Sequence, residues 1–195
     1  MRPSMRTTPL LLAALAAACA RAPATPPRAT GPADYFPLAV GNEWVYRDES
    51  PALPPGGQGG TRTVRIVERT KDGYYRDSER GELRADRDCL HDRARQLLCA
   101  PIAAGTSWAS VVSVSSTERY EIAAVGESVA TPAGRFENCV KVRAHNRAAA
   151  TTDLVNEITY APGVGPVRIE TFVVAEGKVT PQFRALLQSY RVGGR

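Results

Sequence analysis

Short runs of alternating apolar and polar residues, separated by turn residues, dominate the globular part of this sequence. In the run 63–69, Val64 and Ile66 share one side of an extended chain, and Arg65 and Arg69 share the other. This period of two predicts antiparallel strands, and no stretch of the domain keeps a helical apolar stripe over several turns. Further strands are predicted at 81–86, 120–125, 136–145, 154–160, 167–173 and 183–190.

The connections between these runs predict a meander. The run 162–166 combines two prolines with two glycines, so it must be the turn of a hairpin. The segment 131–134 predicts another turn, and 71–73 carries the Asp-Gly pair typical of short hairpin loops. A long meander exposes its edges unless it curls, so we expect a curved antiparallel meander sheet or an incomplete β-barrel.

Six aromatic residues are expected on the concave side of this sheet. Ordinary core packing is the favoured interpretation of them, and a cage for an apolar ligand is the alternative. The six are Trp44, Tyr46, Trp108, Phe136, Tyr160 and Phe183.

The first nineteen residues have the composition of an export signal. Arg2 and Arg6 precede an apolar core at 10–15, and small residues at 16–18 precede Cys19. The segment resembles the lipobox of bacterial lipoproteins, which implies cleavage before Cys19 and attachment of lipid to its thiol. An ordinary secretory signal cut at the same place is the main alternative.

These features divide the chain into three parts. Residues 1–18 are the expected signal peptide, which is too short to span a bilayer, residues 19–34 a Pro-rich tether, and residues 35–192 a single β-rich domain. By resemblance to other lipoproteins, Ala20 after the cysteine points to a periplasm-facing anchor in the outer membrane. Secretion or the cell surface is the alternative location.

The charge balance excludes nucleic acid as a partner. Loss of Arg2 and Arg6 with the signal lowers the formal net charge from +5 to +3. The remaining charges of both signs are interspersed, so no patch suits a phosphate backbone. The expected partners are the membrane, through the lipid anchor, and an apolar ligand or another envelope protein.

The remaining cysteines suggest one disulfide. If the chain reverses near Ala94, Cys89 and Cys99 face each other across an antiparallel pair, and export makes a bridge between them persistent. Cys139 is then left over. Its favoured interpretation is a small buried residue, and a reactive thiol is the alternative.

Catalytic and metal-binding patterns are not supported. The domain has two histidines, His91 and His145, which are expected to be exposed, and its cysteines form no Cys-x-x-Cys pair, so no metal or cofactor is expected. It lacks a Gly-x-Ser-x-Gly elbow. The acidic residues of 76–88 lie close to arginines, which keeps them ionised on a solvated strand face and unsuited to general acid catalysis.

Three segments, 34–46, 131–142 and 160–167, carry a further resemblance. Together they are similar to an uncharacterised group of bacterial secreted proteins and lipoproteins in which a "YFPL, G, N, W, Y" opening precedes a β-rich domain. The resemblance implies fold and location and supplies no catalytic residue. We therefore expect a non-enzymatic binding or assembly module. The alternatives are a passive structural lipoprotein and a periplasmic hydrolase.

Overall fold

The computed structural model describes residues 31–51 and 59–193. The expected signal peptide, Cys19, and most of the expected tether lie outside the described residues. In the part of the chain that is described, no helix is long and apolar enough to cross a membrane.

Within residues 31–51 and 59–193, twelve strands form one antiparallel sheet, which confirms the predicted fold class. A short helix, α1 (Pro32–Tyr35), precedes them. The strands are β1 (Glu43–Asp48), β2 (Thr61–Arg69), β3 (Tyr75–Asp77), β4 (Glu82–Ala85), β5 (Cys89–His91), β6 (Gln96–Cys99), β7 (Ser107–Ser113), β8 (Ser116–Thr131), β9 (Gly134–Ala149), β10 (Thr152–Ala161), β11 (Gly165–Ala175) and β12 (Lys178–Arg191).

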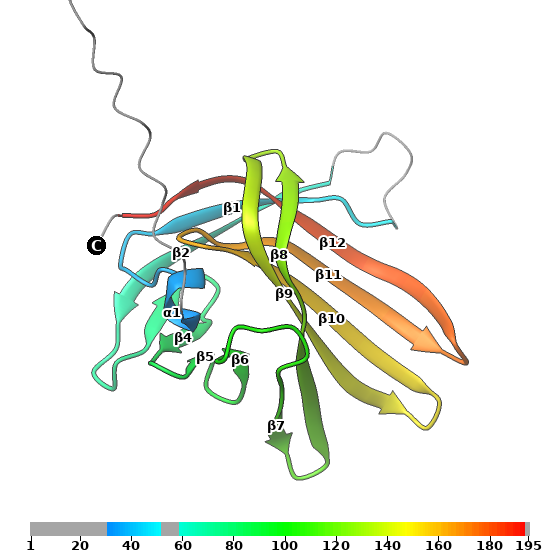
Figure 1. The fold of residues 1–195 in the computed structure, drawn as a ribbon. Helices are drawn as coiled ribbons and strands as arrows, with labels where there is room; N and C mark the ends of the chain where they lie inside the picture. Colours follow the sequence, from blue (N-terminus) through cyan, green and yellow to red (C-terminus); the bar gives the residue numbers. More distant parts are fainter. Residues whose placement is uncertain (1–30, 52–58, 194–195) are drawn as a thin grey trace, which may run out of the picture.

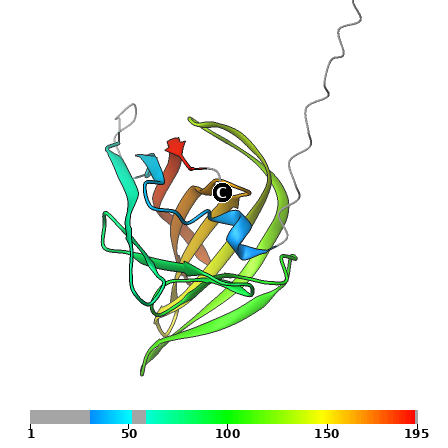
Figure 2. The same cartoon turned by 90° about the vertical axis from the view of Figure 1, so that its left-hand side faces the viewer.

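The sheet curls into a barrel that is nearly closed (Figures 1 and 2). The strand order is β6-β5-β4-β3-β2-β1-β12-β11-β10-β9-β8-β7, so the first and last strands pair in the middle of the sheet. The two edge strands, β6 and β7, are consecutive in the sequence and meet without a backbone ladder between them. We call this junction the seam.

One end of the barrel is closed by the β10–β11 turn. Trp44 Nε1 donates to Val164 O over 2.7 Å, and Tyr46 Oη donates to Pro166 O over 3.0 Å. Gly165 has φ +115°, and a Cβ atom there would lie 3.0 Å from the Phe36 ring and 3.1 Å from Trp44 Nε1. Glycine is therefore required for both the backbone angle and the close approach of the rings.

The β8–β9 hairpin reaches beyond this turn and packs on β12 at the same end. Its turn falls at 131–134, as predicted, and Ala133 N donates to Leu187 O over 3.0 Å. The rings of Phe136 and Tyr190 lie 5.9 Å apart between their centroids.

The segment 31–42 completes this closed end, and we call it the strap. Gly163 N donates to Asp34 O over 2.7 Å, and Tyr35 and Phe36 are buried. Phe36 meets Trp44 edge to face, with centroids 5.0 Å apart. Pro32 is also fully buried, so the last residues of the expected tether pack on the domain.

The β2–β3 connection differs from the short loop that Asp-Gly suggested. It runs from Thr70 to Tyr74, and Thr70 N donates to Tyr74 O over 2.7 Å. The Thr70 hydroxyl also accepts from Tyr74 N at 3.0 Å and so closes the longer loop.

Candidate binding surface on the inner face

Side chains on β8 to β12 form rows across the inner face of the barrel, because residues opposite each other in adjacent strands point the same way. The row next to the closed-end core of Tyr160 and Val167 is apolar. Ile122 and Val142 are buried, whereas Ile158 and Ile169 are half-buried against the core. The row comprises Ile122, Val142, Ile158, Ile169 and Ala185.

The next row, which we call the mixed row, runs from the seam to β12. It carries two of the predicted aromatics at its ends, Trp108 and Phe183, both half-buried against the core. In its middle, Thr171 Oγ1 donates to Asn156 Oδ1 over 2.9 Å. The row comprises Trp108, Tyr120, Ala144, Asn156, Thr171 and Phe183.

The row beyond it, toward the open end, again combines polar and apolar side chains. Leu154 and Val173 are direct partners across β10 and β11, and both remain half-buried. Alternation places them on the same face as Asn156 and Thr171. Apolar side chains on the inner face are thus fully packed at the closed end and only partly covered at the other end.

The six predicted aromatics do not form one cage. Trp44, Tyr46 and Tyr160 are buried in the core at the closed end. Burial raises the pKa values of the Tyr46 and Tyr160 hydroxyls, so both groups stay neutral hydrogen-bonding groups. Phe136 lies under the β8–β9 tip, whereas Trp108 and Phe183 lie on the mixed row.

A buried polar cluster occupies the inner face at the seam. Glu118 is 7% exposed and accepts hydrogen bonds from the Tyr120 hydroxyl and, over 2.9 Å, from Arg95 Nε. Burial and the hydrogen bond to the Glu118 carboxylate raise the pKa of Tyr120. Burial opposes a raised pKa for Arg95, but Glu118 and then Asp92 outweigh it, so Arg95 stays charged.

Side chains of β7 replace the missing ladder at the seam. Trp108 Nε1 donates to Gln96 O over 2.7 Å, and Gln96 N donates to Ser110 Oγ over 3.0 Å. The Trp108 ring stacks on Tyr120, with centroids 5.5 Å apart and planes 8° apart. Sequence reasoning missed Ser110, Glu118 and Arg95, because nothing in their spacing indicates that they meet.

The structure contains the predicted disulfide between Cys89 and Cys99, which are direct partners across β5 and β6. Cys139 is free and fully buried, in agreement with its favoured interpretation. Its thiol donates to Phe136 O over 3.6 Å. Burial, followed by the carboxylates of Glu127 and Glu137, raises the pKa of this thiol to about 11.

The two histidines are less exposed than predicted, because both are half-buried. His91 Nε2 lies 2.7 Å from Asp86 Oδ2, and Asp86 also accepts from the backbone N–H groups of Asp88 and Cys89. The pKa of Asp86 is lowered: burial opposes this, but the hydrogen bonds from Cys89, His91 and Asp88 outweigh it. A pocket of about 460 Å³ lies beside this turn, against α1, and His91 is not among its lining residues.

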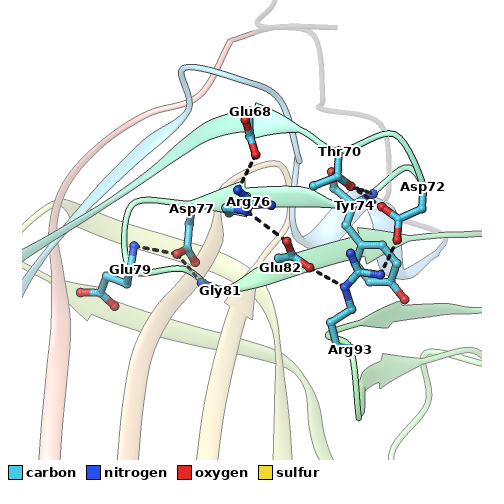
Figure 3. A network of polar contacts seen from close by, with 10 residues as sticks. All are labelled: Glu68, Thr70, Asp72, Tyr74, Arg76, Asp77, Glu79, Gly81, Glu82 and Arg93. Atoms are coloured by element: carbon cyan, nitrogen blue, oxygen red, sulfur yellow. Dashed lines mark hydrogen bonds and ion pairs between the residues drawn. The ribbon is translucent and has the colours of Figure 1, made fainter.

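The charge-dense segment forms a network on the outer face (Figure 3). Arg76 contacts Glu68 over 2.7 Å and Glu82 over 3.0 Å, and Arg93 binds both Glu82 and Asp72. The hydrogen bonds from Arg93, then Arg76, lower the pKa of Glu82. The Glu82 carboxylate is therefore ionised, which agrees with a solvated face and not with a general acid.

Within the described residues, no group of three or more histidine, cysteine or acidic side chains is placed to hold a metal ion. What the inner face offers chemically is apolar contact, together with neutral and charged hydrogen-bonding groups at one margin.

Comparison with known proteins identifies no family. No family model and no curated protein matches the chain. Two solved structures resemble it, each at 15% sequence identity, covering 80% of this chain and 98% of the other. One is a candidate lipoprotein from Parabacteroides distasonis, with a TM-score of 0.44, and the other a candidate exported protein with a YmcC-like fold from Bacteroides fragilis, with a TM-score of 0.47. At these scores the likeness carries no inference about function.

Proposed function

We propose that this protein is a lipid-anchored, non-enzymatic binding module of the bacterial envelope, attached through Cys19. Its inner face binds the apolar chain of an amphipathic molecule. The observation that carries the proposal is the partial burial of Leu154, Val173 and Phe183, which point inward yet lack the full packing of the closed end. Completing their burial would yield about 25 cal/mol for each Å² of apolar surface removed from water.

The character of the surface favours an amphipathic ligand over a purely apolar one. The apolar side chains of Leu154 and Val173 lie next to the amide of Asn156 and the hydroxyl of Thr171. Such a surface can cover a hydrocarbon chain while hydrogen-bonding groups remain near a polar head. The proposed location is the periplasmic side of the outer membrane.

Native mass spectrometry of the protein extracted from its own membrane tests both parts of the proposal. We expect a mature chain that begins at Cys19, carries lipid on it, and retains a further noncovalent mass. A chain with an unmodified Cys19 contradicts the anchor, and an empty lipid-modified chain contradicts the binding function.

Binding is also measurable with an environment-sensitive fatty acid probe such as cis-parinaric acid. The double variant Leu154→Gln/Val173→Gln should weaken probe binding about tenfold, because two polar amides then face the hydrocarbon chain. Val174→Gln is the matched control, since Val174 is also half-buried but points to the outer face of β11. Equal affinity in the double variant and the control would contradict the proposed site.

A further inference from the structure

The seam is the weakest junction in the sheet. Every other pair of neighbouring strands is joined by a backbone ladder. At the seam, by contrast, hydrogen bonds that involve side chains connect β6 and the residue before it to β7 and β8: Trp108 Nε1 donates to Gln96 O, Gln96 N donates to Ser110 Oγ, and Arg95 Nε donates to Glu118. Parting these strands breaks these three hydrogen bonds and leaves every ladder intact.

The two sides of the seam are each held to their own half of the sheet. On one side, the disulfide between Cys89 and Cys99 fixes β6 to β5. On the other, β7 pairs with β8 from Ser107 to Ser113. A separation at the seam would therefore move two intact sheet margins and would not unfold either strand.

The seam also leads directly to the proposed binding surface. Trp108 donates a hydrogen bond to Gln96 O of β6. It is also the first residue of the mixed row, which ends at Phe183. When β7 moves away from β6, the row becomes accessible from the side, where the polar groups of Glu118 and Arg95 line the opening. A molecule with a polar head and an apolar chain could pass here with its head among those groups.

We propose that β6 and β7 separate at the seam to admit an apolar chain sideways onto the inner face of the barrel, with the Arg95–Glu118 pair as the latch. This inference rests on the proposed binding function and adds the route and the residues that control it.

The route is tested by cross-linking the seam. In the variant Gln96→Cys/Ser110→Cys, a short bifunctional thiol reagent joins β6 to β7, and peptide mapping verifies the link. We expect the linked protein to take up cis-parinaric acid at least tenfold more slowly in stopped-flow fluorescence than the same variant without the link. The matched control, Ser107→Cys/Glu121→Cys, links β7 to β8 across an existing ladder and should leave the rate unchanged. Equal rates in the linked and unlinked seam variant overturn the lateral route.

The opening itself is tested without any ligand. Ser110 is 6% exposed, so a cysteine there reacts with a water-soluble maleimide only when the seam opens, and the native Cys139 serves as a buried reference. We expect Ser110→Cys to react at least fivefold faster when it is combined with Glu118→Gln, which removes the charge that holds Arg95, whereas the rate at Cys139 should not change. If Glu118→Gln does not speed the reaction at Ser110→Cys, the Arg95–Glu118 pair does not hold the seam and the inference fails. Absence of probe binding to the wild-type protein would instead refute the binding function.

Discussion

The thiol of Cys139 shows how burial changes the chemistry of a single residue. Its pKa is raised from the ordinary 9.0 to about 11, first by burial and then by the nearby Glu127 and Glu137. The thiolate is the reactive form. At pH 8 we therefore expect iodoacetamide to alkylate Cys139 at least about tenfold more slowly in the folded protein than in the urea-unfolded chain. Fast alkylation of protein that is folded by circular dichroism would contradict this.

The same pKa shift makes stability depend on pH. Because the folded pKa lies above the unfolded one, the native state keeps the proton while the unfolded chain loses it. The stabilisation from this group is complete below about pH 9 and is lost as the pH rises toward about 11. Comparison with Cys139→Ala, which lacks this titration, isolates the effect in urea unfolding curves.

Individual residues were predictable where local geometry decides their contacts. Cys89 and Cys99 flank a short chain reversal, so their spacing was enough to predict that they form a disulfide. Glu118 and Arg95 were not predictable, because they meet only after the sheet has curled and brought β6 against β7 and β8. The half-burial of His91 was missed for a similar reason, since it depends on Asp86 in the preceding turn.

At the scale of elements, the β5–β6 hairpin depends on its disulfide. Its strands are only three and four residues long. The double variant Cys89→Ala/Cys99→Ala should lower the free energy of unfolding by about 2 to 3 kcal/mol, because the unfolded chain regains the freedom of the loop. Urea unfolding of the variant and the wild type measures this. A link from Cys139 to either cysteine in non-reducing peptide mapping would contradict the hairpin register.

Strand prediction succeeded for the long hairpins and failed at β7. The sequence of β9 to β12 alternates clearly, and the Pro- and Gly-containing turn at 162–166 fixes one of their connections. In contrast, β7 (Ser107–Ser113) does not alternate in the expected way, because Ser110 is buried and bonds to β6 whereas Val111 is exposed. An alternation rule has little signal in such a strand.

For the whole molecule, the contrast between the laddered strands and the seam predicts that backbone amides differ in their protection from hydrogen exchange. In hydrogen exchange at neutral pH, amides of β9, β10 and β11 should be the slowest, because each of these strands is paired on both sides. Amides of β6 and β7 should exchange faster, apart from that of Gln96, which donates to Ser110 Oγ. Uniform protection across all strands would show that the seam is as stable as a ladder.

The overall shape was only partly predictable. A meander rule pairs each strand with its neighbours in the sequence, which holds everywhere except between β6 and β7. The pairing of β1 with β12, such as Glu43 with Arg191, is not encoded in any local turn. The β1–β12 pairing brings Trp44 of β1 and Leu187 of β12 into the same buried core. The alternation pattern within a single strand does not reveal such a contact.

The strand order also bears on how the chain folds. Segments 43–99 and 107–191 are each a series of hairpins between near neighbours, which can form rapidly and on their own. Among the strand pairings of the described residues, only the β1–β12 ladder joins residues from opposite ends of the domain. Because the entropy lost on closing a loop grows with the logarithm of its length, nearly all of the long-range cost falls on this one pairing. Two locally ordered halves would therefore form early. Formation of the β1–β12 ladder between them would then be the rate-limiting step of folding.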